Sequence, residues 1–173
     1  RVLFRSDLAP LAALRALRAL ECSHTQVASL APLAGLPMLQ VLHCSGTQVA
    51  DLSPLAALAA LQVLYFSNTA VGSLAPLAGL TALQVLSCAH TQVTSLAPLA
   101  GLRELREFSC ADTQVADLRP LTGLAGLQWF SCASTPVKDL APLGGKSALR
   151  WGACARSEEH TSELQSRLHL VCR

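Results

Sequence analysis

The chain has 173 residues, which suggests a single domain, and 51% of them are hydrophobic although only 4% are aromatic. Its core must therefore be built mainly from small aliphatic side chains. The formal net charge of +2 indicates neither a nucleic-acid partner nor a membrane surface. No apolar run reaches the roughly 20 residues that a membrane-spanning helix needs.

From Asp7 onward the sequence repeats itself with a 22-residue period. One unit can be written LxPLxxLxxLxxLxCxxTxVxxL, and no gap separates the units. Its first leucine recurs as Leu8, Leu30, Leu52, Leu74, Leu96, Leu118 and Leu140. A single unit cannot bury its own leucines, but stacked units bury each leucine against the same position of the neighbouring unit. The period therefore predicts a solenoid with one continuous core.

The first half of each unit, LxPLxxLxxL, predicts a short 3-10 or α-helical segment, because apolar residues recur at every third position. Each proline fits the first turn of such a helix, where its missing N–H group costs nothing. An aspartate or serine stands three residues before each proline and can cap the turn. These capping residues are Asp7, Ser29, Asp51, Ser73, Ser95, Asp117 and Asp139.

The second half of each unit predicts a short β-strand with one buried face. In LQVLHCSGTQV, Leu42 and Cys44 alternate with Val41, His43 and Ser45, which is the period of two of a strand. We expect Leu42 and Cys44 to face the core and the other three residues to face outward. Successive strands would form a parallel sheet, with the helical segments on the opposite face.

The unit resembles the leucine-rich repeat, because LxxLxCxxTxV is similar to the family signature LxxLxLxxNxL. The 22-residue length and the DLxPLxxLxxL half resemble the bacterial internalin-type class. The resemblance extends over residues 7–155, as six full repeats and a truncated seventh. It implies an α/β solenoid that forms a right-handed arc, with a parallel β-sheet on the concave face and short 3-10 or α segments on the convex face. It also implies a role in protein binding. Threonine replaces the family's asparagine in this chain.

Six cysteines occupy the inward strand position where the family has leucine. They are Cys22, Cys44, Cys88, Cys110, Cys132 and Cys154. Phe66 stands at the same position of the third unit, so we expect an apolar role in the core. Neighbouring Cβ vectors run parallel there and suit a disulfide poorly, and metal or redox chemistry is the alternative. A row of free thiols favours a reducing compartment such as the bacterial cytoplasm.

The repeats contain no motif that indicates catalysis. GxGxxG, P-loop, HExxH and Ser-His-Asp patterns are absent, and no cofactor or metal site is predicted. Cys22 with His24, and Cys88 with His90, lack the CxxC pair that usually accompanies a zinc site. A threonine recurs in each unit, and an outward row of threonines would indicate an ice- or surface-binding array. Because the threonine occupies the family's inward turn position, this array is a remote alternative.

The outward strand positions carry the variation between units. They include both tryptophans and the single tyrosine, the residue types that anchor protein interfaces. The predicted partner-binding residues are Val41, His43, Val63, Tyr65, Val85, Glu107, Trp129 and Trp151. We expect a protein–protein interaction scaffold with no nucleic acid, membrane or small-molecule substrate. The alternatives are the recognition domain of a larger enzyme or effector, and a sheet face that varies without a partner.

The two ends of the chain do not follow the repeat. The seventh unit stops after Ala155, and RSEEHTSELQS replaces the next threonine and valine. Read in reverse as complementary codons, RSEEHT can encode the opening RVLFRS, and RSEEHTSELQS resembles a translated sequencing adapter. Residues 1–6 and 156–173 are therefore predicted to lie outside the repeat domain, whose true caps would be missing. We expect residues 158–173 to add no strand in register with the sheet. A native polar cap is the alternative.

Overall fold

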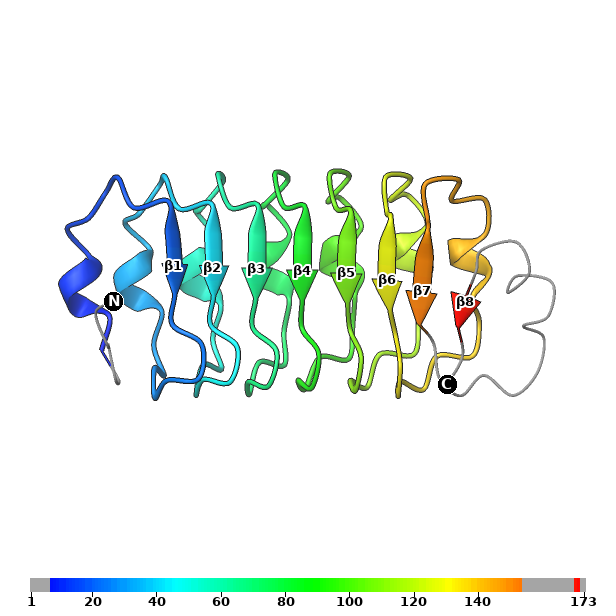
Figure 1. The fold of residues 1–173 in the computed structure, drawn as a ribbon, viewed down its shortest axis with the longest axis horizontal. Helices are drawn as coiled ribbons and strands as arrows, with labels where there is room; N and C mark the ends of the chain where they lie inside the picture. Colours follow the sequence, from blue (N-terminus) through cyan, green and yellow to red (C-terminus); the bar gives the residue numbers. More distant parts are fainter. Residues whose placement is uncertain (1–6, 154–169, 172–173) are drawn as a thin grey trace.

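The structure is a computed structural model, and it describes residues 7–153 and 170–171. These residues form an open, parallel sheet whose strands follow one another in sequence order from β1 to β8 (Figure 1). From β1 to β7, each connection between strands passes through a 3-10 helix on the opposite side of the coil. Crossovers between parallel strands are right-handed. The predicted solenoid, with a sheet on one face and short helices on the other, is confirmed.

The strands are short and pair in a constant register. Their bounds are β1 Ala19–Glu21, β2 Val41–His43, β3 Val63–Tyr65, β4 Val85–Ser87, β5 Glu107–Ser109, β6 Trp129–Ser131, β7 Trp151–Ala153 and β8 Leu170–Val171. Each residue of β1 to β6 lies opposite its counterpart in the next repeat, as Val41 lies opposite Val63. The backbone pairing continues beyond the strands, because His24 N donates to Ser45 O at 2.8 Å. The sequence period therefore becomes the spatial register.

A 3-10 helix precedes each strand from β1 to β7. The helices are η1 Ala9–Leu11, η2 Ala31–Leu33, η3 Ser53–Leu55, η4 Ala75–Leu77, η5 Ala97–Leu99, η6 Arg119–Leu121 and η7 Ala141–Leu143. Proline lies in the first turn of each, as predicted. The N-cap residue itself is a leucine without a side-chain cap bond, but the predicted aspartate or serine just before it binds the start of each helix. Asp51 Oδ1 accepts from Ser53 N at 2.8 Å, and the equivalent bond recurs before every one of these helices.

The core fills the space between the sheet and the helices with columns of mostly identical residues. Leucines of successive coils, such as Leu36, Leu58 and Leu80, lie one above another and are buried. Leu42 and Cys44 are buried on the inward side of β2, whereas Val41 and His43 are partly exposed on the outward side. The inward and outward assignment made from the period of two is therefore correct.

The recurring threonine is an internal part of each turn. Thr113 Oγ1 donates to the carbonyl oxygen of Cys110 at 2.6 Å, and the same bond recurs in the other five coils. Thr113 is 1% exposed. A hydroxyl that is buried and donates to the backbone cannot present a flat outward array. This position removes the premise of the ice-binding alternative.

The residue before each threonine takes a left-handed backbone conformation. Five of these residues are not glycine: His24, Asn68, His90, Asp112 and Ser134 have φ between 53° and 56°. Asparagine, aspartate and histidine are the non-glycine residues most often found there. Gly46 is the exception in the column, and a Cβ on it would meet the His24 Nδ1 atom at 2.6 Å. The glycine therefore makes room for the imidazole of the preceding coil.

The strand β8 pairs with the sheet, although residues 158–173 were expected to add no strand in register with it. Leu170 lies opposite Gly152 in a parallel pairing with β7. The physical reason is that the edge of a strand presents unpaired N–H and C=O groups, which an extended segment can satisfy. Strict repetition would pair Gly152 with a position beyond Arg173, the last residue of the chain, so β8 does not continue the repeat. Residues 1–6, 154–169 and 172–173 lie outside the described residues, and their adapter-like origin stays a prediction.

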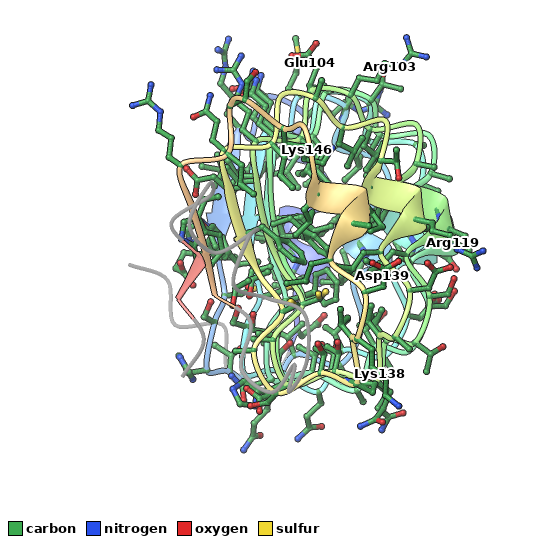
Figure 2. All side chains as sticks on the ribbon, turned by 90° about the vertical axis from the view of Figure 1, so that its right-hand side faces the viewer. Arg103, Glu104, Arg119, Lys138, Asp139 and Lys146 are labelled. Atoms are coloured by element: carbon green, nitrogen blue, oxygen red, sulfur yellow. The ribbon has the colours of Figure 1, made fainter. Side chains whose placement is uncertain are left out.

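Lys146 departs from the repeat, and its burial was not predicted from the sequence. It occupies the position of Leu124 one coil later, yet it is only 4% exposed. Its Nζ atom donates to the carbonyl oxygens of Thr122 at 3.1 Å and Leu124 at 2.9 Å (Figure 2). Burial lowers the pKa of this amine. A charged group thus replaces one core leucine by binding the backbone of the preceding coil.

The buried threonine bonds should contribute measurably to stability. We expect Thr113→Val to lower the free energy of unfolding by about 1–2 kcal/mol, because the shape is kept while a buried carbonyl loses its donor. Urea unfolding monitored by circular dichroism measures this difference. Thr25→Val is the matched control: the same bond is present at 2.6 Å, but Thr25 is partly exposed and water can replace the hydroxyl. Equal losses at both sites would contradict the prediction.

Candidate functional site

The predicted partner-binding residues form two adjacent rows on the outward side of the sheet. The first row starts the strands and contains Val41, Val63, Val85, Glu107, Trp129 and Trp151, each opposite the next. The second row ends the strands, and there His43 lies opposite Tyr65. The sheet therefore brings all eight positions together on one face. For Trp151 this placement is that of the backbone alone.

A hollow of about 280 Å3 opens on this face between two aromatic residues. Its lining residues are Tyr65, Val85, Leu86, Ser87, Glu107, Ser109 and Trp129. Tyr65 belongs to β3 and Trp129 to β6, so the hollow spans the two strands between them. Ser87 and Ser109 are small side chains in the second row, and their size leaves the space open. The sequence shows that both positions are serine. Only the structure shows that Tyr65 and Trp129 lie on either side of them.

A second set of polar contacts lies nearer the N-terminal end of the same face. His43 Nδ1 and Glu21 Oε2 are 2.7 Å apart, and the His43 and Tyr65 rings meet edge to face at 4.7 Å. Burial alone would raise the pKa of Glu21, but hydrogen bonds from Ser23 and His43 outweigh it, and the pKa is lowered. Glu21 is not among the residues predicted for the site. Its place in the column of His43, one repeat earlier, was the available signal.

The cysteines behave as core residues in four of the described coils. Cys22, Cys44, Cys88 and Cys110 are buried and free. Burial raises the pKa of Cys22 to about 11, with the charge of Glu21 adding to it, and raises that of Cys110 to about 12. The apolar role predicted for these four thiols is confirmed.

Cys132 corrects the prediction that the cysteines of the row are free thiols, because it is disulfide-bonded. None of the four free cysteines is its partner. Parallel Cβ vectors disfavour a disulfide only between neighbouring coils that both follow the repeat. Cys132 lies in the sixth coil, just before the chain departs from the repeat, so this geometry does not apply to it. A mixed row of free and bonded cysteines does not assign a redox compartment.

Residues 7–153 and 170–171 contain no cluster of three or more histidine, cysteine, aspartate or glutamate side chains that could hold a metal ion. Within the same ranges, no helix is long and apolar enough to cross a bilayer. Exposed polar contacts do occur at the turns, such as His90 Nε2 to Asp112 Oδ2 at 3.3 Å. What the outward surface offers chemically is a set of aromatic rings, small hydroxyls and carboxylates on a rigid sheet.

Comparisons with known proteins agree with this architecture. A family model described as leucine-rich repeats (2 copies) matches residues 37–79 and 59–101. An internalin (inlF) structure from Listeria monocytogenes superposes with a TM-score of 0.82 at 25% identity, over 87% of this chain and 46% of its own. Internalin C2 from the same organism gives a TM-score of 0.71 at 31% identity, over 83% of this chain and 74% of its own.

A third solved structure is the functional domain of InlJ from Listeria monocytogenes, which includes a cysteine ladder. It superposes with a TM-score of 0.71 at 19% identity, over 87% of this chain and 32% of its own, which indicates a shared fold. No curated protein matches the chain. The fold and the matched repeats define a leucine-rich-repeat protein. Within that class, the chain belongs to the internalin-like family, and it spans about half the length of the inlF structure.

The buried thiols should react slowly while the chain is folded. The thiolate is the reactive form, so a pKa of about 11 against the ordinary 9.0 lowers the reaction rate of Cys22 by about a hundredfold near neutral pH. Cys88 and Cys110 should react more slowly still, because they are fully covered. Alkylation with N-ethylmaleimide followed by peptide mass spectrometry tests this. Labelling in urea is the control, and rapid labelling of Cys88 in the folded chain would contradict it.

Proposed function

We propose that this chain is a protein-interaction module that binds its partner on the sheet face, centred on Tyr65 and Trp129. The observation that carries the proposal is the hollow of about 280 Å3 between these two residues. Tryptophan and tyrosine are enriched among the residues that dominate interface energies. Both side chains are already partly buried, so covering them requires little further ordering of the chain.

The remaining predicted residues extend the proposed surface on both sides of the hollow. Val41, Val63 and Val85 form a partly buried apolar strip along the first row. His43 flanks this strip, and its ring is held between Glu21 and Tyr65. A rigid sheet with apolar, aromatic and polar groups in fixed positions supports recognition of one specific surface, because little conformational entropy is lost on binding.

The opposite face supports the choice of the sheet. The exposed residues that begin the helices are mostly small, as at Ala31, Ala75 and Ala97. Such side chains bury little area and cannot act as anchors. The leucine-rich-repeat fold is in general a common scaffold for protein–protein interaction, which supports a binding role for this chain. Because the chain spans only part of the inlF structure, the recognition module would act within a larger protein, and an attached enzyme or effector domain is the second candidate.

A displayed library of random peptides can test the proposal without the natural partner. Peptides selected on the folded chain should lose about thirtyfold in affinity to the Trp129→Ala and Tyr65→Ala variants, because truncating a central anchor costs about 2 kcal/mol. Affinities are measured by titration calorimetry, and circular dichroism verifies that each variant is folded.

The control for this experiment is Arg103→Ala. Arg103 is exposed, and it points away from the sheet at the edge of its coil (Figure 2). Binding that is lost with Arg103→Ala and kept with both aromatic variants would show that the sheet face is not the site.

A further inference from the structure

The hollow between Tyr65 and Trp129 is not purely apolar, because a charged residue lines it. Among the described residues that line it, Glu107 is the only charged one. Its neighbours in the first row are Val85 on one side and Trp129 on the other. A carboxylate thus lies in an otherwise apolar row and lines a space flanked by aromatic residues.

The carboxylate of Glu107 is not neutralised by a cationic side chain in the described structure. The ion pairs found in the described residues join Glu21 to His43, His90 to Asp112 and Arg119 to Asp117. Glu107 is exposed, and its carboxylate therefore remains available to a ligand. Burial raises the pKa of Tyr65, and the charge of Glu107 raises it further.

The two outward rows carry the same sign of charge along β1 to β6. Their only charged residues at these positions are Glu21 and Glu107, and neither row contains lysine or arginine between Ala19 and Ser131. A partner that covers this face with an acidic segment would meet unpaired like charge. A partner that covers it with a purely apolar segment would bury the Glu107 carboxylate without compensation, which is unfavourable.

We propose that the hollow receives a lysine or arginine side chain of the partner, with its aliphatic stem against Val85, its cationic group beside the rings of Tyr65 and Trp129, and its charge paired with Glu107. The proposal rests on the proposed function, and it specifies the chemistry of the partner at the centre of the site. Cations bind favourably to the faces of tryptophan and tyrosine, and more strongly when water is excluded. Ser87 and Ser109 add hydroxyl oxygens that can accept hydrogen bonds from an ammonium or guanidinium group.

The test uses the displayed library of random peptides, selected on the folded chain at low salt. The selected peptides should share one lysine or arginine. Glu107→Gln should weaken their binding about tenfold, since it removes a charge and keeps the shape. A peptide whose shared cation is replaced by norleucine should bind the wild-type chain at least as weakly as the original peptide binds the Glu107→Gln variant, because norleucine also loses the contacts of the cation with the two rings. The two changes should not add, because each removes the same pair.

Glu104→Gln is the matched control, because Glu104 is an exposed carboxylate of the same coil that points away from the sheet (Figure 2). Binding should be unchanged in this variant. Raising the salt concentration should weaken binding to the wild-type chain more than binding to Glu107→Gln, since screening acts on the pair that the variant lacks.

The outcomes separate the cation site from the general binding face. Peptides that depend on Trp129 but share no cation, or that bind Glu107→Gln as tightly as wild type, would overturn the cation site and leave the binding face in place. Selected peptides that are indifferent to both Trp129→Ala and Tyr65→Ala would overturn both proposals.

Discussion

The parallel backbone ladder, held at a constant offset of one repeat, is the interaction on which the rest of this structure depends. It places each residue directly beside its counterpart in the next coil, as with Leu42 and Leu64. A side chain that fits its column in one coil fits the same column in most others, so the core consists mainly of leucines, with Phe66, Phe108 and Phe130 at a few inward positions. The same ladder positions Thr113 to donate to the strand carbonyl of Cys110 and fixes one left-handed residue in each turn.

The difference between inward and outward positions of the strands explains where a binding surface can arise. The inward columns tolerate little change, because a wrong volume at one position would disturb two neighbouring coils. The outward rows have no such restriction, and there the chain places residues as different as Val85, Glu107 and Trp129 next to one another. Residues on the sheet face can therefore vary to suit a binding partner without altering the fold. The hollow results from a difference in side-chain size, because the small Ser87 and Ser109 lie between the large Tyr65 and Trp129.

The sequence predicted the features that follow from periodicity alone. The solenoid, the inward and outward assignment of Leu42 and Val41, and the capping of the helices each require only a repeated pattern and local chemistry. Two site features needed coordinates. The hollow depends on how far the Tyr65 and Trp129 side chains reach over the strands between them, and the contact of Glu21 with His43 depends on rotamers. Periodicity places a residue on a face, but it does not determine which space a side chain fills.

The predictions failed where the repeat itself changes, and the failures share a physical cause. In a regular coil, the coils before and after it supply the same backbone and core contacts at each position, so one consensus unit describes every coil. At the seventh coil, Gly144 takes an extended conformation in place of the helical one found after the other six helices, and Gly145 has a φ of +78°. The altered turn accompanies a lysine in the leucine column, and Lys146 Nζ is satisfied by two carbonyl oxygens of the sixth coil. A buried amine is tolerated there because backbone acceptors replace its hydration. Whether a departure from the repeat is tolerated therefore depends on local hydrogen bonds. A consensus unit does not contain this information.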